Sequence, residues 1–238
     1  MYASGVPTAS ALIEQLRTIG SDLSDDLSAQ IMALDHAAVP LLLNLLDEEP
    51  AATSACSDCG HLHGDQDLSP REWAPLHAAD LLTELREPAA IGAMLKILER
   101  TSVDAPIHDK VVECLPDFGE AALEPTLAAL ARTKVDSDTA ESLCCVLSAL
   151  GLRDERILQA LMNLMKVHPR AAAMYLADYG DPAAGPAVLG VIATFELDVD
   201  DSFGRTELVD LLDAYAALGG ELPANVKTRV DGWLAESS

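Results

Sequence analysis

The chain has 238 residues, of which 50% are apolar and only 4% aromatic, so a folded core must be built from aliphatic side chains. Asp and Glu outnumber Lys and Arg by 39 to 15, which gives a formal net charge of -24. Such a surface repels the phosphates of nucleic acid and of anionic lipid, so we expect neither nucleic acid nor a membrane as partner. The negative electrostatic field of the chain would attract a basic protein or peptide. The negative charge is equally well explained as a means of keeping the protein soluble.

The N-terminal sequence MYASGVPTASALIEQL lacks a basic stretch followed by a long apolar one. No segment of the sequence approaches the roughly 18 consecutive apolar residues of a membrane span. We therefore expect a cytoplasmic protein. The cysteines agree with a reducing compartment, because their number is odd and Cys114, Cys144 and Cys145 lie within apolar helical patterns.

Five segments of the chain repeat one pattern and superimpose without a gap. In the fourth copy, for example, Leu158, Leu161, Met162 and Met165 fall at i, i+3, i+4 and i+7, the spacing of an amphipathic helix. Each copy is preceded by Asp, Glu or Gly, as is common where a helix begins. The copies are HAAVPLLLNLL from His36, PAAIGAMLKIL from Pro88, EAALEPTLAAL from Glu120, ERILQALMNLM from Glu155 and PAAGPAVLGVI from Pro182.

A second amphipathic segment stands before each copy, so each unit is a helical hairpin that buries its apolar stripe by stacking on its neighbours. We predict an all-α fold without strands: a single domain over residues 1–238, folded as an α-solenoid (α-α superhelix) of about six hairpins. TASALIEQLRTIG forms an N-terminal capping helix in this scheme. The predicted repeats span about 24–49, 70–101, 105–134, 138–168, 170–195 and 204–236, with an insertion loop at 50–69.

The segments DHAAVPLLLNLLDEE, REPAAIGAMLKILE and YGDPAAGPAVLGVI resemble the second helix of HEAT repeats, in particular the short HEAT-like repeats of bilin lyases and related bacterial proteins. WAPLHAADLLTEL resembles a first helix, and the resemblance covers residues 24 to 195. It implies a curved, right-handed α-solenoid whose second helices line a concave surface. It implies no chemistry, because this architecture serves scaffolds, adaptors, lyases and hydroxylases alike.

The insertion contains CSDCGHLHGD, which brings two cysteines and two histidines into one short run. Thiolate and imidazole are the ligands that zinc prefers, so Cys56, Cys59, His61 and His63 form a candidate zinc site. Structural zinc sites usually draw their ligands from two separated pairs, whereas this run is continuous. A polar rim loop with two free thiols is the alternative, and a redox CxxC is a third interpretation, although no strand precedes it.

His77 and His108 occupy nearly equivalent positions in the first helices of two adjacent predicted repeats. This arrangement resembles the HEAT-repeat deoxyhypusine hydroxylases, whose di-iron centre uses His-Glu pairs repeated at that position. The chain departs from that pattern, because Ala78 follows His77 and the later repeats contain no His-Glu pair. We interpret both side chains as core or capping histidines.

The repeat array and the acidic excess favour a non-enzymatic interaction or scaffold module that holds a protein or peptide, basic in character, on its concave face. Polar residues of the second helices are the candidate partner contacts, namely Asn44, Lys96, Thr126 and Asn163. The alternative is an accessory lyase or a metal-dependent enzyme that uses the groove as a pocket and the loop from Cys56 to His63 as a reactive or metal-bearing lid. No catalytic residue is assigned.

If the four predicted ligands hold zinc, purified protein should carry about one equivalent, with Zn–S distances near 2.3 Å in X-ray absorption spectra. Cys59→Ser should abolish the metal and leave the helical circular-dichroism signal unchanged, because the insertion lies outside the predicted repeats. Protein that is purified under reducing conditions and contains no zinc would contradict the site.

Overall fold

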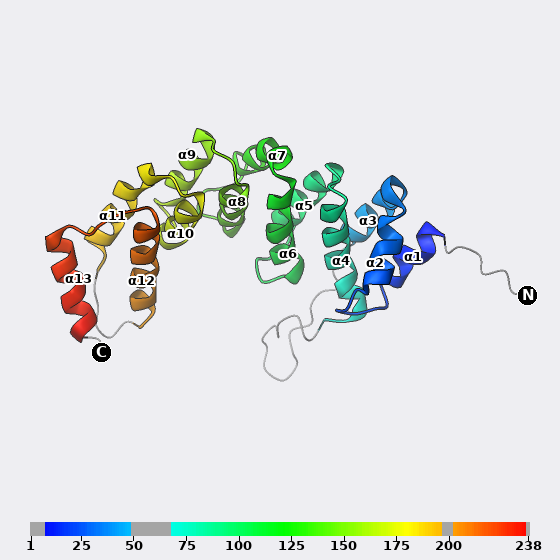
Figure 1. Cartoon of the computed structure of the whole chain (residues 1–238), viewed down its shortest axis with the longest axis horizontal. Coiled ribbons are helices and arrows are strands. Elements are labelled where there is room, and N and C mark those ends of the chain that lie inside the picture. Colours follow the sequence, from blue (N-terminus) through cyan, green and yellow to red (C-terminus); the bar gives the residue numbers. More distant parts are fainter. Residues whose placement is uncertain (1–7, 49–67, 197–201, 237–238) are drawn as a thin grey trace, which may run out of the picture. The chain divides into compact units, whose positions relative to one another are not determined.

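The computed structural model describes residues 8–48, 68–196 and 202–236 (Figure 1). These residues form α-helices and short 3-10 turns, and no strand lies among them, which confirms the all-α prediction. They divide into two compact units, Met1–Thr126 (unit 1) and Leu127–Ser238 (unit 2), with the boundary inside helix α7 (Glu120–Leu130). The repeat pattern contains no sign of this boundary, since it predicts one domain over residues 1–238.

Unit 1 consists of helices that pack mainly on neighbours close in the sequence. Helix α4 contacts α3 and α6, and α5 contacts α3, α4 and α6. The predicted first helices α4 and α6 are therefore neighbours, as are the predicted second helices α3 and α5 (Figure 1). Besides the start of α7, the elements are α1 (Ala9–Gln15), α2 (Asp25–Met32), η1 (Asp35–Ala37), α3 (Val39–Leu46), α4 (Pro70–Glu84), α5 (Ala89–Arg100), α6 (Pro106–Cys114) and η3 (Leu115–Phe118).

Unit 2 follows the same rule of local packing. Helix α10 contacts α8, α9, α11 and α12, and α11 also contacts α12. Helix α9 contacts α8 and α10. After the end of α7, the elements are α8 (Asp138–Ala149), α9 (Glu155–Leu164), α10 (Pro169–Tyr179), η4 (Pro182–Ala184), α11 (Gly185–Thr194), α12 (Ser202–Ala217) and α13 (Ala224–Glu236).

Polar side chains fix where several of these helices begin. Ser69 and Glu72 form a capping box at the start of α4, in which the backbone N–H of Ser69 donates to Glu72 Oε2 at 2.7 Å. Ser24, Ser137 and Asp154 accept backbone N–H groups in the first turns of α2, α8 and α9. Each cap satisfies a donor that the helix itself leaves without a partner.

The core of both units is aliphatic, as the composition requires, with fully buried Leu42, Leu82 and Leu98 in unit 1. The stripe predicted for α9 is wrong in part: Leu161 and Met165 are buried, whereas Leu158 and Met162 are only half-buried. Ile157 and Leu164 are buried as well, because α9 packs against α8 and α10 and this turns its buried face. Within the described residues, no helix combines the length and the apolar character that crossing a membrane requires.

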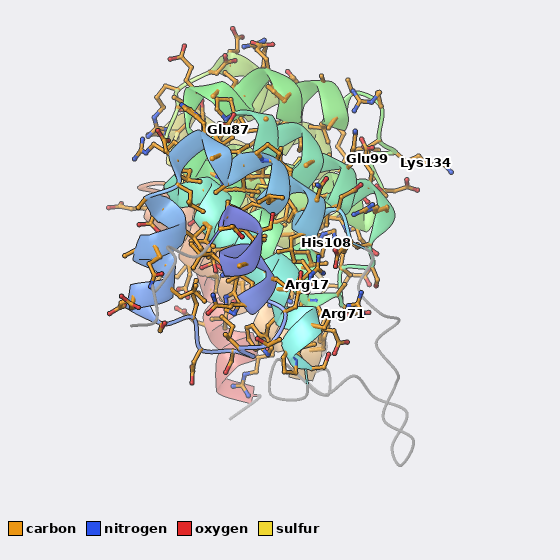
Figure 2. All side chains as sticks on the ribbon, turned by 90° about the vertical axis from the view of Figure 1, so that its right-hand side faces the viewer. Arg17, Arg71, Glu87, Glu99, His108 and Lys134 are labelled. Carbon is orange, nitrogen blue, oxygen red and sulfur yellow. The ribbon has the colours of Figure 1, made fainter. Side chains whose placement is uncertain are left out.

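An ion pair links the first helices of unit 1 to the end of α3. Arg17, labelled in Figure 2, lies just after α1 and donates from both terminal nitrogens to the carboxylate of Glu48. Hydrogen bonds to Glu48 raise the pKa of Arg17 and lower the pKa of Glu48. Arg100 of α5 pairs with Asp47 at 3.0 Å, so α5 is tied to the same end of α3.

Two glycines of unit 2 should respond in opposite ways to an added methyl group. A Cβ on Gly220 would lie 2.3 Å from the buried ring of Tyr215, whereas a Cβ on Gly190, in the exposed face of α11, would meet nothing within 4 Å. We expect Gly220→Ala to lower the free energy of unfolding by about 1–3 kcal/mol and Gly190→Ala to raise it by about 0.5–1 kcal/mol. Urea denaturation measures both, and equal effects of the two substitutions would contradict the packing around Tyr215.

Candidate functional site

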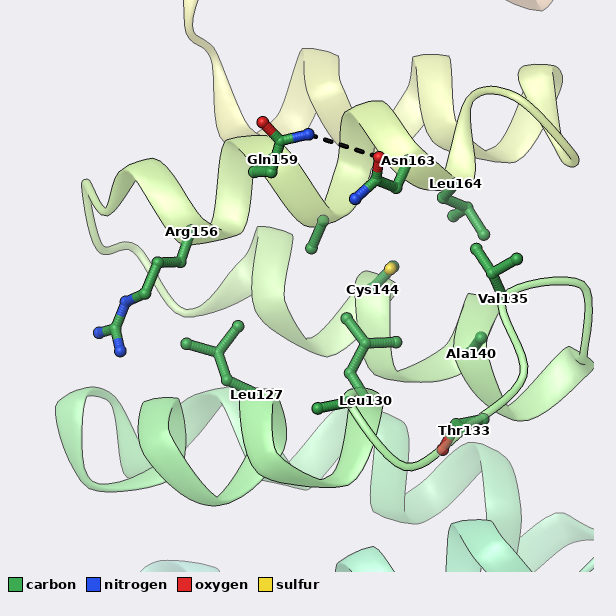
Figure 3. Close-up of a pocket in the computed structure, with 12 residues that line it drawn as sticks. Leu127, Leu130, Thr133, Val135, Ala140, Cys144, Arg156, Gln159, Asn163 and Leu164 are labelled. Carbon is green, nitrogen blue, oxygen red and sulfur yellow. Dashed lines mark hydrogen bonds between the residues drawn. The ribbon is translucent and has the colours of Figure 1, made fainter.

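A hollow of about 380 Å³ opens on unit 2 between the C-terminal end of α7, the segment that follows it, α8 and α9 (Figure 3). We call it the apolar hollow, because mostly apolar atoms line it. Leu127 and Leu130 form one wall from α7, and Cys144 contributes from α8. Helix α9 presents residues spaced three and four apart, from Arg156 to Leu164, which is one face of a helix.

Small side chains account for the space. Ala140 and Ala160 line the hollow from α8 and α9, and Ala131 lines it from the segment just after α7, where larger side chains would fill it. At its edge Val135 is 45% exposed, which is unusual for a large aliphatic residue in this chain. The hollow therefore offers apolar surface to another molecule without any movement of the helices.

Two amide side chains, Gln159 and Asn163, line the hollow from α9, and Lys166 lies just after this helix. Gln159 Nε2 donates to Asn163 Oδ1 at 3.4 Å, and Lys166 Nζ donates to the same oxygen at 2.9 Å. The amide of Asn163 is half-buried. These contacts give an otherwise apolar hollow a small set of oriented polar groups, which is typical of ligand-binding hollows.

Arg156 is the one charged residue among those that line the apolar hollow, and its charge is matched locally. Its Nη2 lies 2.8 Å from Asp154 Oδ2, and its backbone N–H donates to Asp154 Oδ1 at 2.8 Å. The hydrogen bonds from the Arg156 side chain and backbone lower the pKa of Asp154 to about 2. The hollow is thus close to neutral at physiological pH.

Burial makes the cysteines of the described residues poor nucleophiles. Desolvation raises the pKa of Cys144, which lines the apolar hollow, to about 12 and that of Cys114 to about 11. Burial also raises the pKa of Cys145. Because the thiolate is the reactive form, these side chains act as apolar packing groups near neutral pH.

The predicted partner-binding residues differ in their exposure. Asn44 on α3 and Lys96 on α5 are exposed in unit 1, and Asn163 lies at the apolar hollow of unit 2. Thr126 is fully buried, and its Oγ1 has no hydrogen-bond partner among the described residues. Thr126 does not reach the surface, because it lies on the buried face of α7 together with Ala122, Leu123 and Ala129.

A second hollow, of about 420 Å³, lies in unit 1 between the end of α4 and the segment α6–η3. Its lining is mainly polar and includes the carboxylates Asp80, Glu84, Glu113 and Asp117. Lys110 partly neutralises it, with Nζ 3.2 Å from Asp80 and 2.8 Å from Glu113. Burial opposes the charge on Lys110, but the hydrogen bonds to Glu113 and Asp80 outweigh it and raise the pKa of Lys110 to about 12.

The two histidines of the predicted first helices are buried and hydrogen-bonded to the protein, as we expected of core histidines. His77 Nε2 lies 2.7 Å from the carbonyl oxygen of Gly20, and its ring stacks on Trp73. His108 Nδ1 lies 3.2 Å from Thr101 Oγ1. In the part of the chain that the structure describes, no group of three or more His, Cys, Asp or Glu side chains is placed to hold a metal ion.

The predicted zinc ligands Cys56, Cys59, His61 and His63 lie outside the described residues, so the zinc site stays a prediction.

No protein-family model, curated protein or solved structure matches the chain. The resemblance to HEAT repeats therefore depends on the sequence pattern alone.

The sequence pattern predicted Asn163 but missed the apolar hollow beside it. Two signals in the sequence point to it: Val135 stands alone among polar residues after α7, and Gln159 and Asn163 are spaced four apart, on one face of α9. The alanines that leave the space open give no such signal, because alanine is common throughout the sequence.

The burial of the Cys114 and Cys144 thiols predicts how their alkylation rates depend on pH. Since their pKa values are raised, Cys114 and Cys144 should react with iodoacetamide at pH 8 at least about 100-fold more slowly than a free thiol with pKa near 8.5. The rate should rise about tenfold per pH unit without levelling off below about pH 11 for Cys114. Peptide-level mass spectrometry measures each site, and protein unfolded in guanidinium serves as the control. Equal rates in folded and unfolded protein would contradict the burial of these thiols.

Proposed function

We propose that this chain is a non-enzymatic interaction module that holds a segment of a protein partner on the surface formed by the second helices of HEAT-like hairpins stacked as an α-solenoid. Two helices of the apolar hollow, α7 and α9, occupy the predicted second-helix positions of consecutive repeats. Solenoid repeats commonly bind extended partners along such a surface. This placement supports a binding role for the second helices.

The observation that carries the proposal is the apolar hollow itself. It is large enough for an aliphatic or aromatic side chain, and such a side chain gains about 1.5–3 kcal/mol when it is fully buried. Side chains that anchor a partner in a pocket of this kind dominate the affinity of many interfaces. The partner therefore places one large apolar residue in the hollow.

The lining favours binding over catalysis. No Asp, Glu or His is among the residues that line the hollow, and the thiol that lines it has a pKa near 12. Arg156 is engaged by Asp154. These groups fix the shape and polarity of a binding surface and supply no general base near neutral pH.

The apolar hollow selects for an apolar side chain at short range, and the net charge adds a long-range preference for a basic partner. Carboxylates exceed Lys and Arg in both units, so the field of the chain attracts a basic partner and speeds its approach. The apolar hollow is nearly neutral and does not select for charge. In this proposal, basic character in the partner raises the association rate, and its apolar residue determines how long the complex lasts.

A library of random peptides displayed on phage should test the binding surface directly. We expect the immobilised chain to enrich peptides that share a large aliphatic or aromatic residue. Ala160→Phe should fill the hollow and weaken the enriched peptides by about tenfold or more, since it removes the space for their anchor. Isothermal titration calorimetry measures the affinities.

Ala193→Phe is the matched control, because Ala193 is an exposed alanine of α11 outside the hollow and its replacement should leave binding unchanged. Ala131→Phe fills the same hollow from the segment just after α7 and covers the case in which Ala160→Phe does not fold. Failure to enrich any peptide, or equal binding by the wild-type chain and both hollow-filling variants, would contradict the proposed function.

A further inference from the structure

The side-chain amide of Asn163 has a fixed orientation. Lys166 Nζ lies 2.9 Å from Asn163 Oδ1, and an ammonium group can only donate hydrogen bonds. The atom that faces Lys166 must therefore be the amide oxygen, and the 3.4 Å contact from Gln159 Nε2 reaches the same oxygen. The two neighbours hold the amide in one of its two possible orientations.

The amide nitrogen consequently faces the other way. Figure 3 shows Asn163 on α9 with its nitrogen directed towards the apolar hollow and its oxygen towards Gln159. Nδ2 donates to no side chain or backbone atom among the described residues. The rim therefore presents a neutral, oriented donor next to an apolar surface.

A bound peptide offers the matching acceptor. When an apolar side chain enters a hollow, the main-chain carbonyl groups on either side of it lie at the rim, and each must find a donor or keep its water. A neutral amide donor suits a main-chain carbonyl, because it adds a directed hydrogen bond without the desolvation of a charged group. Lys166 is tied to Asn163 Oδ1 on the side away from Nδ2.

We propose that Asn163 sets the register of the bound segment by donating from Nδ2 to a main-chain carbonyl oxygen next to the apolar anchor, and that Lys166 is a positioning residue that holds the amide in this orientation. The inference rests on the proposed function, since it requires a peptide segment in the apolar hollow. It makes Asn163 a specificity-determining residue: the hollow accepts the anchor, and the amide decides how the backbone lies across it.

Substitutions at Asn163 test the donor. Asn163→Asp keeps the shape but replaces the donor by an acceptor that faces the carbonyl, so the affinity for the best peptide from the library should fall by about tenfold or more. Asn163→Ala should cost about threefold to tenfold, and Lys166→Met about twofold to threefold because the amide can then rotate. Asn225→Asp makes the same change at an exposed position of α13 and should leave the affinity unchanged.

An ester scan of the same peptide identifies the acceptor. Replacing one backbone amide by an ester weakens its carbonyl as an acceptor, so we expect one position near the anchor to lose affinity for the wild-type chain. That position should show no further loss with Asn163→Ala, which identifies the two groups as partners. If Asn163 had only a structural role, Asn163→Ala would not cancel the effect of an ester at one chosen position.

The possible results distinguish a failure of the register role of Asn163 from a failure of the proposed peptide-binding function. If Ala160→Phe weakens the peptide but Asn163→Asp and the ester scan show no coupled loss, the register role is wrong and the binding hollow stands. If neither Ala160→Phe nor Ala131→Phe affects the peptide, or if the library yields no peptide, the proposed function fails and the register role fails with it.

Discussion

Every helix of this chain depends on burying an aliphatic stripe against helices that are near it in the sequence. Aromatic residues make up only 4% of the chain, so few large rings are available to form a central core. Instead, α4 packs on α3 and α6, and α10 packs on α8, α9, α11 and α12. Short aliphatic and alanine side chains allow such close helix packing. At one place, where Ala131, Ala140 and Ala160 come together, the small side chains leave the apolar hollow open.

The position of the helices could be predicted from the sequence because each repeat carries the same spacing of apolar residues. The predicted second helix from Glu120 coincides with α7, and the one from Glu155 begins where α9 begins. Burial within a helix was harder to predict: Ile157 and Leu164 are buried, while Leu158 and Met162 are half-buried. A periodicity of about 3.6 residues identifies an apolar face, but packing against two neighbours widens and turns that face.

The candidate site was predictable only in part, for a related reason. Asn163 is a polar residue on an otherwise apolar second helix, and such a residue is visible in the sequence. Thr126, in contrast, stands at a position of the apolar stripe in its copy of the repeat, and it is fully buried. Whether a polar residue faces solvent depends on how its helix is rotated within the fold, which one residue cannot reveal. The hollow itself depends on Ala131, Ala140 and Ala160, which come from three consecutive stretches of the chain, so the apolar spacing within one helix does not reveal it.

The central claim is that the apolar hollow of unit 2 receives an apolar side chain of a protein partner. Methyl-selective nuclear magnetic resonance of the whole chain, titrated with a peptide that it binds, tests this claim most directly, because Leu127, Leu130, Val135 and Leu164 each carry methyl groups at the hollow. We expect the largest shift changes, and intermolecular Overhauser effects to the peptide anchor, at these residues. Contacts from the anchor to methyl groups elsewhere, with these four unchanged, would contradict the claim.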